Sequence, residues 1–125
     1  MSVRVLLVED EATVRQIVGG MLVRLGYTLL DVPDAASALD LAANHKGPIH
    51  LVLTDIVMPQ VSGPQLARQL KNLRGDMKVL FMSGYMDDEF HGIAKPERNF
   101  IQKPFTATDL AEKLRGVLAA DEREA

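Results

Sequence analysis

The chain has 125 residues, of which 47% are hydrophobic and 25% charged, and its formal net charge at pH 7 is −3. This length and balance suit one compact domain with its own core, and the negative charge does not favour a surface for nucleic acid or acidic membranes. The absence of cysteine excludes disulfides, thiolate metal sites and cysteine nucleophiles. No apolar stretch has the length of a signal peptide or a transmembrane helix, so we expect a cytoplasmic protein that does not insert into membranes.

Short apolar runs alternate with helical patterns along the chain. The runs have the length and composition of buried strands and cover residues 3–8, 28–32, 49–54, 78–82 and 99–102. Between them, one helix ends at Gly26, one begins at Asp34, and one begins at the capping box of Ser62 and Gln65. A short helix between residues 87 and 93 and a last helix from residue 106 complete the pattern.

The apolar faces of these helices identify the residues that should pack against the sheet. In the first helix they are Val14, Ile17, Val18, Met21, Leu22 and Leu25. In the second they are Ala35, Ala38, Leu39 and Ala42. In the third and the last they are Leu66, Leu70, Leu73, Leu110, Leu114, Val117 and Leu118. Strand followed by helix, five times, predicts an α/β domain over residues 1–120, with helices on both faces of a parallel sheet, and a charged tail or linker start at residues 121–125.

Four of the five predicted strands end in a side chain capable of chemistry. Glu9 and Asp10 follow the first strand, Asp55 the third, Ser83 the fourth and Lys103 the fifth. The carboxyl ends of parallel strands lie on one rim of the sheet, which is where ligands bind in open α/β folds. We therefore expect these side chains to meet in one cleft, although they lie far apart in the sequence.

Carboxylates that share a cleft repel one another and raise each other's pKa unless a cation neutralises them. None of the three histidines follows a strand end, so the ligands of such a cation would all be oxygens. Oxygen ligands favour a hard cation, and we expect Mg²⁺ first. With Lys103 as a positive charge and Ser83 as a hydroxyl donor, the site suits phosphoryl transfer with Asp55 as the nucleophile.

Each of these residues also has a simpler explanation. Glu9 or Asp10 could cap the first helix, Asp55 could start a turn, and Lys103 could be a solvated lysine. A phosphatase with an aspartyl-phosphate intermediate is a second function, but it needs an acid two residues after the nucleophile, where this chain has Val57. A third is an interaction module that is never phosphorylated, and the presence of all the acids together with the lysine counts against it.

The same residues resemble the receiver domain of two-component response regulators. The resemblance rests on motifs in matching order: the acid pair Glu9-Asp10, D-x-x-M-P at residues 55–59, Ser83, and Lys103-Pro104-Phe105. It covers residues 3–120 and implies a flavodoxin-like sheet in the strand order 2-1-3-4-5 with five helices. It also implies that Asp55 accepts a phosphoryl group from a sensor histidine kinase or a phosphotransfer protein. The residues in and around these motifs are most similar to those of receivers attached to hybrid sensor kinases.

For the cation, the resemblance implies Mg²⁺ bound directly by Asp10, by Asp55 and by the backbone carbonyl of Val57. Glu9 would contact the water molecules around the ion and not the ion itself. Lys103 would contact the phosphoryl group. With Val57 and Tyr85 beside the acceptor, no acidic or amide side chain is placed to steer a hydrolytic water, so we expect the domain to catalyse only its own phosphorylation and a slow autodephosphorylation.

For signalling, the resemblance implies that Ser83 moves toward the phosphoryl group and that Phe100 turns inward as it does so. These two switch residues would change an output face made by the fourth helix, the fifth strand and the last helix. The output would be read by a downstream protein or a fused kinase, without contact to nucleic acid by this domain.

Overall fold

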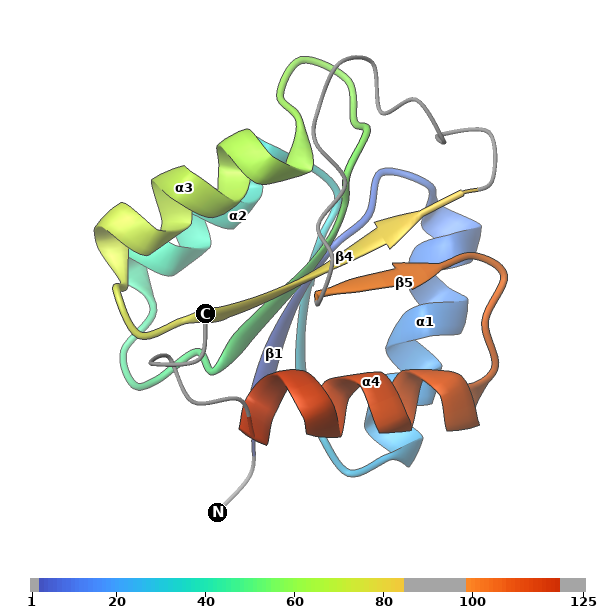
Figure 1. Cartoon of the computed structure of the whole chain (residues 1–125). Helices are drawn as coiled ribbons and strands as arrows, with labels where there is room; N and C mark the ends of the chain where they lie inside the picture. The colour runs from blue at the N-terminus through green and yellow to red at the C-terminus, as the bar shows by residue number, and fades with distance from the viewer. Residues whose placement is uncertain (1–2, 85–98, 120–125) are drawn as a thin grey trace.

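The computed structural model describes residues 3–84 and 99–119, and these form one five-stranded parallel sheet with helices on both faces (Figure 1). The strands are β1 (Arg4–Val8), β2 (Thr28–Val32), β3 (Leu51–Asp55), β4 (Lys78–Ser83) and β5 (Phe100–Gln102). Their order across the sheet is β2-β1-β3-β4-β5, which confirms the expected α/β fold and topology. β3 lies in the centre and is buried along its whole length, as its continuous apolar run predicts.

The register of the sheet aligns the ends of the strands. Val8 pairs with Thr54, Asp55 with Met82, and Ser83 with Gln102. The residues at or just after these strand ends therefore share one rim. At the opposite rim β3 begins at Leu51, two residues later than expected, and the Arg4 backbone N–H donates to the His50 ring at 2.8 Å.

Within residues 3–84 and 99–119 there are four helices: α1 (Ala12–Arg24), α2 (Ala35–Asn44), α3 (Gly63–Leu73) and α4 (Ala107–Ala119). The short helix expected between residues 87 and 93, and the tail at 121–125, lie outside the described residues. Within the described ranges, none of the helices combines the length with the apolar character that a transmembrane segment needs. The predicted capping residues act as expected: Asp34 accepts a hydrogen bond from the Ser37 N–H, and Ser62 and Gln65 form a capping box.

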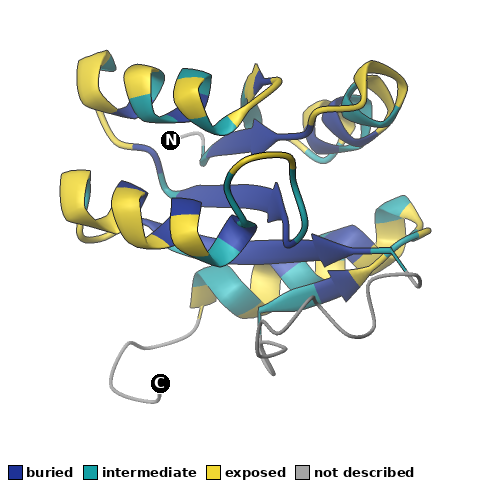
Figure 2. Cartoon of the chain, turned by 90° about the horizontal axis from the view of Figure 1, so that it is seen from above, coloured by how far each residue is buried: buried dark blue, intermediate teal, exposed yellow. Residues whose placement is uncertain are grey.

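The helices form a layer on each side of the sheet (Figures 1 and 2). α2 and α3 cover one face, over a core that includes Leu6, Val52 and Leu66. α1 and α4 cover the other, over a core that includes Leu7, Leu53 and Leu110. Burying apolar side chains on both faces contributes most of the stability, at about 25 cal/mol per Å² removed from water.

Two residues of the predicted helix faces are exposed. Ile17 retains 54% of its accessible surface and Leu73 retains 50%. In α1 the buried side is centred on Val18 and Leu22, which are four residues apart, and Ile17 lies one step outside this stripe. Leu73 is the last residue of α3, three residues beyond Leu70, which is the last buried residue of that helix.

Arg74 joins the ends of α2 and α3 at the rim opposite the predicted site. Its Nε donates to the Ala42 carbonyl and its Nη1 to the Gly47 carbonyl, both at 2.8 Å, and its Nη2 donates to the His45 carbonyl. The carbonyls near the end of a helix lack intrahelical partners, so a guanidinium with several donors can satisfy them together.

Replacing Arg74 with alanine should therefore lower the free energy of unfolding by about 2 kcal/mol, because half-buried carbonyls lose a charged donor. Urea unfolding followed by circular dichroism measures this loss. Lys71→Ala is the matched control, since it removes an exposed positive charge from the same helix. Equal stability of the two variants would contradict the role given to Arg74.

Candidate functional site

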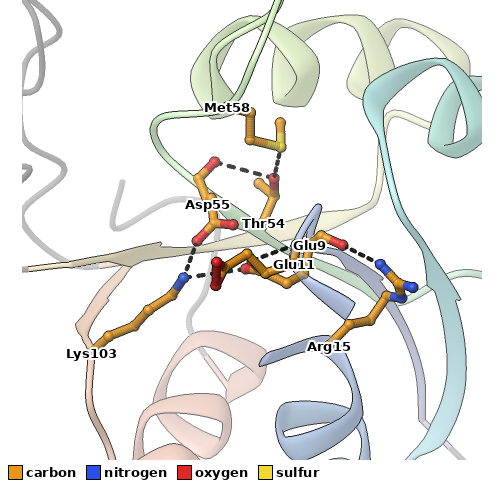
Figure 3. A network of polar contacts seen from close by, with 7 residues as sticks. All are labelled: Glu9, Glu11, Arg15, Thr54, Asp55, Met58 and Lys103. Carbon is orange, nitrogen blue, oxygen red and sulfur yellow. Dashed lines mark hydrogen bonds and ion pairs between the residues drawn. The ribbon is translucent and has the colours of Figure 1, made fainter. Parts of the chain in front are cut away.

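The predicted rim brings Glu9, Asp55 and Lys103 into direct contact (Figure 3). Lys103 Nζ lies 2.6 Å from Asp55 Oδ1 and 3.2 Å from Glu9 Oε2. Both acids are buried, with 1% exposure for Glu9 and 6% for Asp55. Two buried carboxylates therefore share a single ammonium group at the end of the central strands.

Asp10 completes a cluster of three acids. One carboxylate oxygen from each of Glu9, Asp10 and Asp55 lies within 4.8 Å of the others, and Asp10 is exposed. Neither Glu9 nor Asp10 is the N-cap of α1: that position is Glu11, whose side chain makes no capping hydrogen bond. Instead Glu9 Oε1 accepts the Glu11 backbone N–H at 3.2 Å, which holds the Glu9 carboxylate beside the start of the helix.

The protonation state of each of the three contacting groups depends on the other two. Burial, followed by the hydrogen bond with Glu9, raises the pKa of Asp55 from 3.8 to about 8, against the opposing effect of Lys103. Burial also opposes ionisation of Glu9, but the hydrogen bond from Asp55 and the charge of Lys103 lower its pKa overall. Burial disfavours the Lys103 ammonium, yet the two carboxylates raise its pKa. Without another cation, the pair of buried acids thus retains one proton.

The donor set fits a hard divalent cation such as Mg²⁺. All three side chains offer carboxylate oxygens, and a second positive charge would replace the proton that the buried pair retains. Three protein carboxylates leave part of an octahedral shell for water and phosphate oxygens, which is how Mg²⁺ is commonly bound.

The loop between β3 and α3 is tightly held next to Asp55. The buried Thr54 hydroxyl lies 3.2 Å from the Asp55 carbonyl and 3.6 Å from Met58 Sδ (Figure 3). Gln60 has a φ of 74°, and the N–H of the next residue donates to the carbonyl of the residue before it at 2.8 Å. This is a γ-turn with a left-handed central residue, a strained conformation that the surrounding structure must support. Val57, half-exposed, lies in this loop.

The loop ends at Gly63, the first residue of α3. Its N–H donates to the Ile56 carbonyl at 2.7 Å. A Cβ atom built on Gly63 would lie 2.1 Å from the Asp55 carbonyl oxygen. The helix thus approaches the backbone of Asp55 so closely that only glycine fits.

The two expected switch residues lie on neighbouring strands, with Ser83 at the rim end of β4 and Phe100 at the start of β5. Ser83 is 2% exposed, and its hydroxyl donates to the Gly84 carbonyl at 3.1 Å. Its own carbonyl accepts the Lys103 backbone N–H at 2.7 Å, which ties Ser83 to the residue that contacts both acids. Phe100 is half-buried at the start of β5, paired with Phe81.

Residues 5–115 match the family model of the response regulator receiver domain. The chain belongs to this family. The match spans β2 to β5, all of β1 except Arg4, and residues 107–115 of α4, so it includes every residue of the rim described above.

Relatives of this receiver domain occur alone and in larger proteins. It is 37% identical over 121 residues to the sensor kinase CckA of Brucella abortus (strain 2308), a match that covers 94% of this chain and only 13% of CckA. It is 31% identical over 119 residues to the response regulator receiver protein CpdR of the same organism, with 94% of this chain and 98% of CpdR covered.

Solved structures show the same fold. The receiver domain of the hybrid histidine kinase CckA aligns with a TM-score of 0.75 at 31% identity, over 92% of this chain and 98% of that one. A CheY-like receiver domain protein from Methanospirillum hungatei JF-1 aligns with a TM-score of 0.79 at 27% identity, over the full length of both chains.

Three residues that shape this receiver site are not among those predicted from the motifs: Arg15, Thr54 and Gly63. The Arg15 guanidinium donates to the backbone carbonyl of Glu9, and the Thr54 hydroxyl lies beside the sulfur of Met58. Neither partner can be inferred from the type of the side chain alone. Gly63 could have been suspected, because glycine inside a capped first helical turn is unfavourable unless another backbone approaches closely.

Proposed function

We propose that this receiver domain is a phosphoacceptor switch in a two-component phosphorelay, and that Asp55 is the acceptor. The observation that carries this proposal is the position of the Asp55 carboxylate, 2.6 Å from Lys103 Nζ at the end of the central strand. An Asp55 oxygen would attack the phosphorus of a phosphohistidine, the P–N bond would break, and the histidine ring would leave. The phosphoryl donor would be a sensor histidine kinase or a phosphotransfer protein.

The residues around Asp55 supply electrostatic stabilisation. Lys103 would shift from the carboxylate to an oxygen of the arriving phosphoryl group, as a fixed positive charge. Asp10, Asp55 and the Val57 carbonyl would hold Mg²⁺, with Glu9 oriented behind them. The ion, when bound, would neutralise negative charge that develops on the phosphoryl oxygens.

The site is better suited to holding a phosphoryl group than to turning it over. Hydrolysis needs a group that orients or deprotonates a water molecule beside the phosphorus. Two residues beyond the acceptor the chain has Val57, which offers neither a carboxylate nor an amide. We therefore propose that the domain catalyses only its own phosphorylation and a slow autodephosphorylation.

Output would follow from a local charge change. A phosphoryl group on Asp55 offers new acceptors to the Ser83 hydroxyl, which would leave the Gly84 carbonyl, and Phe100 would turn inward in response. The altered face would include β5 and α4 and would be read by a downstream protein or by a kinase attached to the same chain. The similarity to CckA supports the second arrangement, and the similarity to CpdR supports the first.

Incubation with acetyl phosphate and Mg²⁺, followed by intact-protein mass spectrometry, tests this function. The wild type should gain one phosphoryl group that chelation of Mg²⁺ prevents, and Asp55→Asn should gain none. Asp40→Asn, a matched change at an exposed aspartate of α2, should behave as the wild type. After removal of the donor, the adduct should persist for minutes or longer. No mass gain on the wild type, or the same gain on Asp55→Asn, would refute the proposal.

A further inference from the structure

Arg15 reaches from the second turn of α1 back to the loop that carries the acids. Its Nη1 donates to the Glu9 backbone carbonyl at 2.7 Å (Figure 3). Its Nε lies 3.9 Å from Asp31 Oδ2 at the end of β2. The Arg15 side chain is 22% exposed, so its contact with Glu9 is largely shielded from solvent.

The Glu9 residue is held at every polar group. Its N–H donates to the Val32 carbonyl at 3.2 Å, its carboxylate contacts Lys103 and the Glu11 N–H, and its carbonyl accepts from Arg15. The hydrogen bond to Val32 comes from the sheet, and the contacts of the carboxylate come from the site. Arg15 supplies the constraint from the helix side, and it acts on the backbone that leads directly into Asp10.

This loop places three acids in a row next to a fourth carboxylate at the end of β3. Mutual repulsion favours conformations in which the exposed Asp10 turns away from the buried pair. The Arg15 guanidinium, which donates a hydrogen bond to the Glu9 carbonyl, opposes that movement. It also adds a positive charge close to the acids without occupying their oxygens.

We propose that Arg15 is a positioning residue for the cation site, and that it holds the Glu9–Asp10 backbone so that both carboxylates face Asp55 before a cation arrives. This inference rests on the proposed function only in that the acids bind Mg²⁺. Groups that orient metal ligands without touching the metal commonly change metal affinity by 10–100-fold when they are removed. Asp31 assists by orienting the guanidinium; being 47% exposed, it is the weaker contact.

Calorimetric titration of the unphosphorylated protein with MgCl₂ tests the proposal. Arg15→Ala should raise the Kd for Mg²⁺ by roughly tenfold, and Arg15→Lys should recover most of the affinity, because an ammonium can still donate to one carbonyl. Arg24→Ala is the matched control, since it removes an exposed arginine from the last turn of the same helix and should leave the Kd unchanged. Arg15→Gln, which is shorter and uncharged, provides the same comparison if the alanine variant does not fold.

A second readout separates positioning from a general loss of structure. In phosphorylation by acetyl phosphate, the Mg²⁺ concentration for half-maximal rate should rise with the Kd, while the rate at saturating Mg²⁺ should stay within about twofold of the wild type. A lower melting temperature with an unchanged Kd would overturn the proposal, and so would a fall in the saturated rate alone.

The outcomes also distinguish this inference from the proposed function. Mg²⁺ binding by the wild type without phosphorylation of Asp55 would refute the phosphoacceptor function and leave the role of Arg15 intact. Wild-type affinity in Arg15→Ala would refute the role of Arg15 alone. A wild type that binds no Mg²⁺ would refute both the cation site and its positioning residue.

Discussion

Gly63→Ala should destabilise the domain by about 3 kcal/mol and slow Mg²⁺-dependent phosphorylation at Asp55. The added Cβ would lie 2.1 Å from the Asp55 carbonyl oxygen and 3.0 Å from the Ile56 Cα. Both contacts involve backbone atoms, so no rotation of a flexible side chain can relieve them. Either α3 moves away from β3, or Asp55 moves.

Neither movement is easy. The Gly63 N–H donates to the Ile56 carbonyl at 2.7 Å, and the Ser62–Gln65 capping box fixes the first turn of α3. Leu66, one turn further along, is fully buried under the sheet. A shift of Asp55 instead would break its 2.6 Å contact with Lys103. Either response costs packing or hydrogen bonds, and the second also displaces the proposed nucleophile.

Urea unfolding and the phosphorylation assay measure the two effects. Gly20→Ala and Gly116→Ala are matched controls, because both lie inside helices and no atom approaches within 4 Å of their added Cβ atoms. Each control should raise stability by about 0.5–1 kcal/mol, since alanine loses less backbone freedom on folding than glycine does. A Gly63→Ala protein as stable as the controls would show that α3 can move away at little cost.

Much of this architecture could be predicted because it depends on local pattern and on one rule of topology. Continuous apolar runs identified the buried strands, and Asp34 and Ser62 identified helix starts through their own side-chain chemistry. The convergence of Glu9, Asp55 and Lys103 followed from the shared rim of a parallel sheet, although up to 94 residues separate them. The position of Asp55 in this arrangement is thus a consequence of the fold.

What could not be predicted depends on contacts between side chains and distant backbone. Arg74 binds carbonyls about thirty residues away, and no periodicity marks that contact. The spacing predicts Ile17 and Leu73 in the core because it gives the angular position of a residue on its helix. It does not give the width or the length of the surface that the helix covers.

Asp55→Asn should stabilise the domain, and the gain should grow from about pH 4 to about pH 8, reaching about 2–4 kcal/mol. Burial, then the hydrogen bond with Glu9, raises the pKa of Asp55 from 3.8 to about 8. Between these two values the folded protein holds a proton that the unfolded chain has released. Stability therefore falls as pH rises: the contribution of the protonated carboxyl is complete below the unfolded pKa and is lost as pH passes through the folded one.

Asparagine does not titrate, yet it preserves the geometry, since its amide can donate to Glu9 and its oxygen can accept from Lys103. Glu9 titrates in the opposite sense, because its lowered pKa gives stability that is lost in acid, and it remains in both proteins. Comparing the melting temperatures of the wild type and Asp55→Asn across the pH range therefore isolates the contribution of Asp55. The control Asp76→Asn, at an exposed turn, should follow the wild type.

At high pH, Mg²⁺ should stabilise the wild type far more than Asp55→Asn, because the cation replaces the missing proton beside two buried carboxylates. If the melting temperatures of the wild type and Asp55→Asn differ by the same amount at low and at high pH, Asp55 stays ionised in the folded domain, balanced by Lys103 alone.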